Sequence, residues 1–123
     1  MAKKKWRFEN GMVVWAKVPD RNGFIKPNPR PLLITSVHPT NKKAPFVAHC
    51  ISTKLDNRAN DPTIEMPSDP KSGAGVGLFT QCVVVLRWVA IVEQNRVVDV
   101  TGKVSPEFLA FVLARIEQVK GLP

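Results

Sequence analysis

The sequence predicts a mainly β protein, a small barrel of short strands followed by one C-terminal helix. Three observations support this fold class. Short apolar runs recur along the chain and are separated by loops rich in proline and glycine. The final segment has apolar residues at helical spacing. A chain of 123 residues can bury one hydrophobic core but not two, so a single domain is expected.

The expected strands are runs rich in β-branched and apolar residues. The first is entered from Asn10-Gly11, a turn signal, and the loop after it has four prolines between residues 19 and 31. Proline lacks the N–H that a central strand needs, so this loop is expected to be irregular. Polar residues at 93–95 predict a hairpin between the last two runs. The expected strands are Met12–Val18, Leu32–Val37, Phe46–Ser52, Thr63–Met66, the apolar stretch from Gly75 to Val92, and Arg96–Val100.

The C-terminal segment carries the signals of an α-helix. Ser105 is a good N-cap, Pro106 fits the first turn, and Glu107 suits the positive end of the helix dipole. Gly121 can end the helix. Between them, a stripe of apolar side chains repeats at helical spacing and comprises Leu109, Val112, Leu113 and Ile116.

Positive charge is concentrated in the first half of the chain. The formal net charge is +8; residues 1–30 carry eight lysines and arginines against two acids, whereas residues 91–123 carry four of each sign. A one-sided surplus attracts a polyanion, and the affinity gained by counterion release falls as salt rises. A basic protein without such a partner is the alternative. We divide the chain into a basic N-terminal arm, residues 1–10, and a single barrel domain, residues 11–123.

The sequence predicts neither a membrane-spanning segment nor a secretory signal. The longest apolar run, Cys82–Val92, is too short to span a bilayer and is interrupted by Arg87. The basic start is not followed by the apolar region of a secretory signal, so a cytoplasmic protein is expected. Cys50 and Cys82 lie inside apolar runs, and we interpret them as buried hydrophobic residues rather than a disulfide or a metal pair.

Familiar catalytic motifs are absent from the sequence. It has no glycine-rich phosphate loop, no paired CxxC, no HExxH and no GxSxG, and its few acids are scattered, so no metal or other cofactor is expected. His49 lies in an apolar strand and is interpreted as a core or interface residue rather than a base. His38, directly before Pro39, fits either a structural or a functional role.

RNA can be cut without a metal, because it carries its own nucleophile in the 2′-OH. A protein then needs to orient the phosphate, stabilise the developing charge and move protons. Arg30 is suited to gripping a phosphate at two points, and Pro29 and Pro31 stiffen its backbone. Ser52 or Thr53, at the end of the third expected strand, can donate a further hydrogen bond. Taken singly, these residues are equally typical of an ordinary surface or strand end.

The ordered set of short motifs resembles the MazF/PemK family of toxins. The residues that carry the resemblance are Gly11–Trp15, Arg30-Pro31 before an apolar strand, Cys50–Thr53, Val76–Gln81 and Gly102–Glu107. The resemblance implies an SH3-like barrel of the MazF/PemK/CcdB type with a C-terminal helix. It also implies a homodimeric toxin that cuts single-stranded RNA at short sequences through a 2′,3′-cyclic phosphate, and an acidic antitoxin that blocks it.

The resemblance further implies roles for single residues. Arg30 matches the arginine that contacts the scissile phosphate and aids proton transfer. Ser52 falls where the family usually has a catalytic threonine, with Thr53 as the alternative. Gln81 matches the glutamine beside the site, and the loop from Arg21 to Pro29 matches the loop that covers RNA. The residues expected to hold RNA are Arg21, Lys26, Lys54 and Gln81.

The sequence departs from the family pattern in three places. The loop before Arg30-Pro31 lacks the usual acidic or histidine-bearing segment, Thr80 stands where an acid often precedes the glutamine, and the stretch between Gln81 and Pro106 is longer. These departures leave the general base and the cleavage sequence open. The alternatives are a non-catalytic module of the same fold that binds RNA or an antitoxin, and a barrel that poisons a protein target, as relatives do to DNA gyrase.

Overall fold

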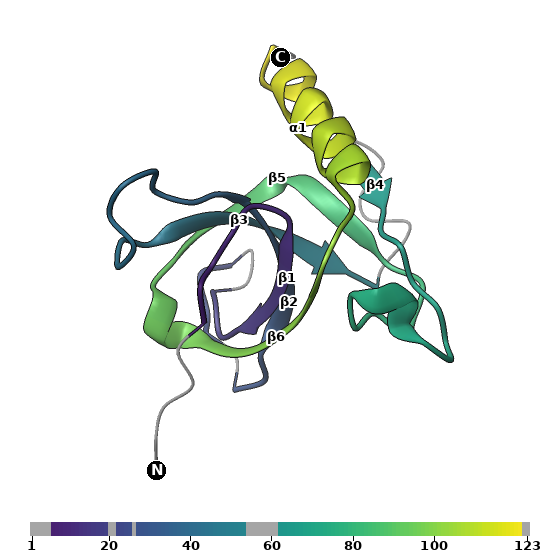
Figure 1. Ribbon diagram of the computed structural model, residues 1–123, viewed down its shortest axis with the longest axis horizontal. Coiled ribbons are helices and arrows are strands. Elements are labelled where there is room, and N and C mark those ends of the chain that lie inside the picture. The colour runs from purple at the N-terminus through teal and green to yellow at the C-terminus, as the bar shows by residue number, and fades with distance from the viewer. Residues whose placement is uncertain (1–5, 20–21, 26, 54–61, 122–123) are drawn as a thin grey trace.

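Figure 1 shows the computed structural model of the chain, which describes residues 6–19, 22–25, 27–53 and 62–121. Strands dominate these residues, and one α-helix ends them, so the predicted mainly β class is confirmed. The elements in chain order are β1 (Met12–Ala16), β2 (Arg30–Ser36), β3 (Phe46–Ser52), β4 (Thr63–Glu65), η1 (Gly73–Gly75), β5 (Val83–Val92), η2 (Gln94–Arg96), β6 (Val97–Lys103) and α1 (Pro106–Lys120), where η marks a 3₁₀-helix.

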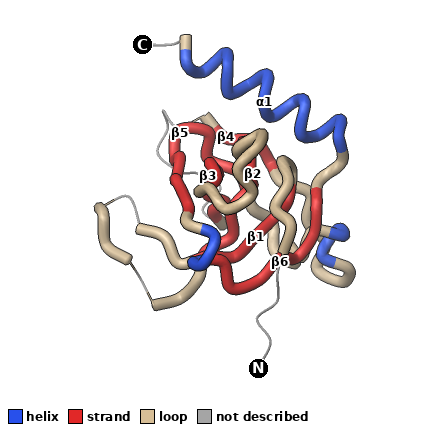
Figure 2. Tube along the Cα trace, turned by 60° about the vertical axis from the view of Figure 1, so that its left-hand side comes forward, coloured by secondary structure: helices blue, strands red, loops and turns tan. Residues whose placement is uncertain are grey.

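The six strands form one antiparallel sheet in the order β4-β5-β3-β2-β1-β6. The sheet curls into a barrel-like shape but does not close, because β4 and β6 are its edges (Figures 1 and 2). Register shifts occur in the β1/β6, β2/β3 and β3/β5 pairings. Such shifts bend a strand and increase its twist, so they allow a short sheet to curl.

Apolar side chains occupy both faces of the curled sheet. We call the cluster inside the curl the barrel core; it includes Val14, Leu32, Ile34, Phe46, Cys50 and Val92. Helix α1 lies across the other face (Figure 2) and covers the helix-side core, which includes Val13, Leu33, Ile51, Val84, Val112 and Ile116. Consecutive strand residues therefore alternate between the two cores, as the two-residue period of a strand requires.

Helix α1 begins and ends where its capping residues predict. The Ser105 Oγ accepts a hydrogen bond from the N–H of Phe108 at 3.1 Å, and Pro106 occupies the first turn. Gly121 follows the last helical residue. The helix buries Val112 against the sheet. Among the described residues, no helix has the length and apolar character needed to cross a bilayer.

One region that was expected to be part of a strand is a turn instead. β5 begins at Val83, so the segment from residue 75 to residue 82 precedes the sheet. Gly77 adopts a φ of 76°, which favours glycine, and the Thr101 Oγ1 donates a hydrogen bond to the Val76 carbonyl at 2.7 Å. Val76 is nevertheless buried in the helix-side core. The apolar pattern therefore reflected burial of a turn, not strand formation.

Both cysteines are buried and neither forms a disulfide within the described part of the chain, so their interpretation as buried hydrophobic residues is confirmed. Cys50 belongs to the barrel core and Cys82 to the helix-side core. Burial, together with the nearby charge of Glu65, raises the pKa of the Cys82 thiol. The reactive thiolate is therefore disfavoured at this position.

Candidate active site

Arg30 is the first residue of β2, and its side chain lies on an aromatic ring. Its backbone pairs with Ala16 of β1, and the flanking Pro29 and Pro31 restrict the chain on either side. The side chain is half-buried, and the guanidinium carbon Cζ lies 4.4 Å from the centroid of the Trp88 ring. This cation–π contact restrains the guanidinium through its face, and the N–H donors point outward in its plane.

Ser52 lies at the same end of the sheet as Arg30. β2 and β3 are antiparallel, and Leu32 of β2 pairs with Cys50 of β3. Arg30 lies two residues before Leu32 and Ser52 two residues after Cys50, so both lie toward the same end of the sheet. Side chains two residues apart share a face, so Arg30 and Ser52 both lie on the face of the barrel core. Ser52 is 7% exposed and pairs with Val83, the first residue of β5.

A register shift between β3 and β5 accompanies the placement of Trp88. His49 pairs with Val89, but Ile51 pairs with Val84. Cys50 of β3 therefore lies opposite four residues of β5, residues 85–88. Trp88 packs against the barrel core and meets Arg30 across β3, which separates β2 from β5 in the sheet. Trp88 was not among the predicted site residues, because a bulge leaves no spacing signal in a continuous apolar run.

Gln81 and Glu65 form a polar pair close to Ser52 in the strand register. The Gln81 Nε2 donates a hydrogen bond to the Glu65 Oε1 at 3.2 Å, and both side chains are exposed. Glu65 pairs with Val83, which pairs on its other side with Ser52, so two strand spacings of roughly 10 Å in total separate Glu65 from Ser52. Glu65 was not among the predicted site residues, because nothing in its three-residue strand distinguishes it. Thr53 follows Ser52 and is exposed.

Three of the four expected RNA-binding residues, Arg21, Lys26 and Lys54, lie outside the described residues, and their roles stay predictions. The described parts of the loop before Arg30 are exposed. Phe24 is 71% exposed and Ile25 is 52% exposed.

His49 is a buried residue on the other face of the sheet. It is 4% exposed, pairs with Leu33 of the helix-side core, and its Nδ1 lies 3.0 Å from the Thr35 Oγ1. Burial, reinforced by the positive charge of Lys120, lowers the pKa of His49 to about 4. The prediction that His49 is a core residue is confirmed, and its position excludes it from the site at Arg30.

His38 has a structural role in the loop after β2. Its Nδ1 accepts hydrogen bonds from the backbone N–H of Asn41 at 2.8 Å and of Thr40 at 3.2 Å. The ring therefore shapes the turn that follows the strand. β2 separates this turn from Arg30, so His38 does not belong to the same site.

The residues at this end of the sheet fit recognition of a phosphodiester. A restrained guanidinium matches the charge and the planar geometry of a phosphate. The Ser52 hydroxyl on the same face adds a group that donates a hydrogen bond. Gln81 and Glu65 add an amide and a carboxylate at the adjoining strand end.

Comparison with known proteins identifies the family. The chain matches the model of one family, described as PemK-like, MazF-like toxin of type II toxin-antitoxin system, over residues 9–119. None of the curated proteins with which the sequence was compared matches it. The matched segment contains Arg30, Ser52 and Gln81, and residues 6–8 precede it. The resemblance read from the sequence is confirmed, and the chain belongs to the family of PemK-like, MazF-like toxins of type II toxin-antitoxin systems.

Proposed function

We propose that this toxin is a sequence-specific endoribonuclease that cuts single-stranded RNA without a metal. The observation that supports this function most directly is the guanidinium of Arg30, 4.4 Å from the Trp88 ring and at the same sheet end as Ser52. A positive group held in place before substrate arrives stabilises developing negative charge at little cost in reorganisation. The net charge of +8 supports a polyanionic substrate.

In the proposed reaction the substrate supplies the nucleophile. The 2′-OH loses its proton, the 2′-oxygen bonds to the adjacent phosphorus, and the bond from phosphorus to the 5′-oxygen breaks. The leaving oxygen takes up a proton, and the upstream fragment ends in a 2′,3′-cyclic phosphate. Arg30 would hold the phosphate, offset the charge on its oxygens and donate toward the leaving oxygen. Ser52, or Thr53 in its place, would donate a hydrogen bond to a non-bridging oxygen.

The other predicted site residues would hold the RNA on either side of the cut. Gln81, two residues before the Val83 that pairs with Ser52, would contact a nucleotide there. Arg21, Lys26 and Lys54 would bind flanking phosphates, because a single strand is gripped mainly through its backbone charge.

Two protein partners complete the proposal. An acidic antitoxin fits the positive charge of this chain and the family's role in toxin-antitoxin systems. A second copy of the chain fits the exposed apolar side chains of β5, where Val89 is 52% and Ile91 is 77% exposed. We therefore propose a homodimer, which the family resemblance also implies.

Cleavage of an unstructured RNA by the purified protein in excess EDTA tests the proposed activity. The wild type is expected to produce fragments with 2′,3′-cyclic phosphate ends, identified by mass spectrometry. Arg30→Ala is expected to lower the cleavage rate by roughly 100-fold or more, the effect of losing one group that stabilises an oxyanion. Arg115→Ala is the matched control, since it removes the same charge from an exposed site on α1.

Two outcomes would contradict the proposal. Full cleavage by Arg30→Ala would remove Arg30 from the mechanism. The wild type could instead bind RNA in a salt-sensitive way and give no cleavage products at any protein concentration. That result would favour the alternative function, a non-catalytic binding module of the same fold.

A further inference from the structure

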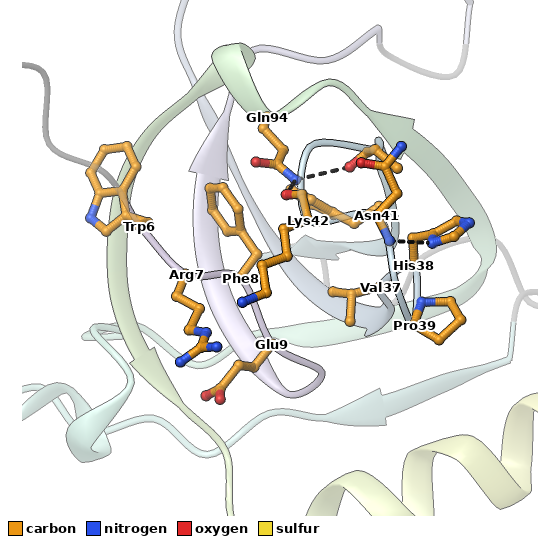
Figure 3. A pocket seen from close by; sticks show the side chains of 12 residues that line it. Trp6, Arg7, Phe8, Glu9, Val37, His38, Pro39, Asn41, Lys42 and Gln94 are labelled. Carbon is orange, nitrogen blue, oxygen red and sulfur yellow. Dashed lines mark hydrogen bonds between the residues drawn. The ribbon is translucent and has the colours of Figure 1, made fainter.

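A second concave site lies at the other end of β2 and β3. A cavity of about 410 Å³ opens between the N-terminal segment 6–9, the loop 37–44 and η2 (Figure 3). β2 begins at Arg30 and ends at Ser36, directly before this loop, so a strand of roughly 20 Å separates the cavity from Arg30. The volume suits one small ligand, and no residue of the candidate active site lines the cavity.

A row of three aromatic rings contributes to the wall of this cavity. Phe46, at the start of β3, is 1% exposed. The ring of Phe8 lies 5.1 Å from that of Phe46 and 6.3 Å from that of Trp6, between centroids. Trp6 and Phe8 are half-buried and pack against the barrel core, which restrains them while part of each side chain stays accessible. Restrained aromatic faces are the surfaces on which single-stranded nucleic acid stacks its bases.

The cavity has a positive rim. Arg7 and Lys42, from the N-terminal segment and from the loop, are exposed and line it. Glu9 is the one acid among the described lining residues, and its Oε2 lies 3.1 Å from the Lys103 Nζ. Because this pairing offsets the charge of Glu9, a phosphate that enters would meet cations from two separate segments.

Polar groups on the wall are fixed by hydrogen bonds within the protein. The Gln94 Nε2 donates to the carbonyl oxygens of Lys42 at 2.6 Å and Ala44 at 2.9 Å, which leaves its Oε1 as the acceptor of that side chain. The His38 Nδ1 accepts from the N–H of Asn41 at 2.8 Å, which leaves the Nε2–H of the ring as a donor. The loop is therefore organised by these hydrogen bonds before any ligand binds.

We propose that this cavity binds one nucleotide of an RNA strand, with the base on Trp6 and Phe8 and the phosphate between Arg7 and Lys42. The inference rests on the proposed function for the choice of RNA, and it adds a second contact far from Arg30. A peptide chain is bound along an extended groove or a sheet edge, whereas this compact open cavity, lined by both rings and cations, suits a single base and its phosphate. Trp6, Arg7 and Phe8 precede the segment that matches the family.

Binding of an RNA that cannot be cut tests this site apart from catalysis. The probe is a fluorescently labelled single-stranded RNA with every 2′-OH methylated, followed by fluorescence anisotropy. Trp6→Ala is expected to weaken binding roughly tenfold, the effect of one lost stacking partner. Lys42→Ala is expected to weaken it several-fold, whereas Lys43→Ala, which removes the same charge from the next residue outside the cavity, stays close to the wild type.

Trp6→Phe separates loss of stacking from loss of fold. It keeps an aromatic face and is expected to retain most of the affinity, and circular dichroism checks that both variants fold. In a nitrogen-15 NMR spectrum, the Trp6 indole N–H signal, assigned by its disappearance in Trp6→Phe, is expected to shift when AMP, CMP, GMP or UMP is added. A glutamate-rich peptide is expected to leave that signal in place.

Wild-type affinity in a folded Trp6→Ala, with an unmoved Trp6 signal, would overturn the inference. A shift with the acidic peptide alone would also overturn it and would assign the cavity to a protein partner. The proposed catalytic function fails in a different way. If the protein binds RNA through Trp6 but does not cut it, the cavity remains an RNA-binding site and the catalytic proposal fails. If the protein cuts RNA but binds it equally well without Trp6, only the proposal for the cavity fails.

Discussion

The orientation of Arg30 depends on Trp88. The guanidinium carbon lies 4.4 Å from the ring centroid, and the ring is held by packing against the barrel core. An arginine restrained in this way loses little freedom when it binds a phosphate, because most of its conformations are already excluded. In the proposed reaction, Trp88 would therefore be a positioning residue that acts through Arg30.

Substitution of Trp88 tests this dependence. Trp88→Leu is expected to lower kcat for RNA cleavage roughly tenfold, since the guanidinium would no longer be restrained, with a smaller change in KM. Trp88→Phe, which keeps an aromatic face, is expected to restore most of kcat. Initial rates over a range of RNA concentrations separate the two constants. Equal kcat values for Trp88→Leu and the wild type, in proteins of similar thermal stability, would show that Trp88 does not position Arg30.

His49 makes the stability of the fold depend on pH. Its pKa of about 4 in the folded protein lies below the ordinary value of 6.5, because burial and the charge of Lys120 disfavour the protonated ring. The unfolded chain therefore binds the proton more readily, and the free energy of unfolding is expected to fall as pH drops from about 6.5 to about 4. The full loss is about 3 kcal/mol, and His49 contributes no slope above pH 6.5.

Urea unfolding of the wild type and of His49→Gln at pH 7, 6, 5 and 4 measures this contribution. Carboxylates titrate in both proteins, so the difference between the two curves isolates the histidine. The stability gap between the wild type and the variant is expected to shrink as pH falls. A gap that stays constant from pH 7 to pH 4 would mean that His49 titrates alike in the folded and unfolded chains.

Among the elements, β6 and the turns around η1 approach each other through their backbones. A Cβ at Gly102 of β6 would collide with the Gly75 carbonyl oxygen and would lie 2.6 Å from the Val76 Cα. These obstacles are backbone atoms, so a side-chain rotation cannot relieve them. The absence of a side chain at Gly102 is what lets the turn buried in the helix-side core lie against the sheet.

Gly102→Ala is expected to destabilise the fold by about 2–3 kcal/mol, the usual cost of forcing extra volume into a packed site. Gly75→Ala is the matched control. A Cβ there meets nothing within 4 Å, so the cost is limited to the positive φ of 75° and is about 1 kcal/mol. Chemical denaturation of the three proteins gives both values. Similar losses in the two variants would show that the contact between β6 and this turn is not tight.

At the scale of the whole molecule, the fold leaves several large apolar side chains exposed. Helix α1 covers the helix-side core, yet Val89 and Ile91 on β5 and Phe111 on α1 stay more than half exposed. A two-fold symmetric dimer brings the same patch of each copy together, so one apolar surface suffices for both partners. The proposed homodimer would bury this surface.

Ile91→Lys tests the dimer. Because Ile91 is 77% exposed, the substitution is expected to leave the monomer folded while placing a charge in the interface. Light scattering after size-exclusion chromatography is expected to give twice the mass of one chain for the wild type and a single chain for the variant at micromolar concentration. A dimer of unchanged stability in the variant would exclude β5 from the interface.

Signals within a few residues determined several elements of this protein but not the hairpin expected around residues 93–95, because β5 and β6 do not pair in the sheet. The limits of β3, the start of α1 at the cap of Ser105 and the burial of His49 all follow from alternation, capping and apolar neighbours, which are properties of adjacent residues. The family could also be recognised from the order of its motifs, and the match over residues 9–119 confirms it. Arg30 stood out because two prolines flank it.

Contacts between residues that are distant in the sequence could be learned only from the tertiary structure. The bulge that places Trp88 across β3 from Arg30, the pairing of Gln81 with Glu65, and the turn that replaced the expected strand before Val83 all depend on contacts between distant segments. Such contacts arise from strand register and from the packing of one backbone against another. Neither leaves a periodic trace in a single sequence, because a residue's own neighbours along the chain do not determine which strand it will face.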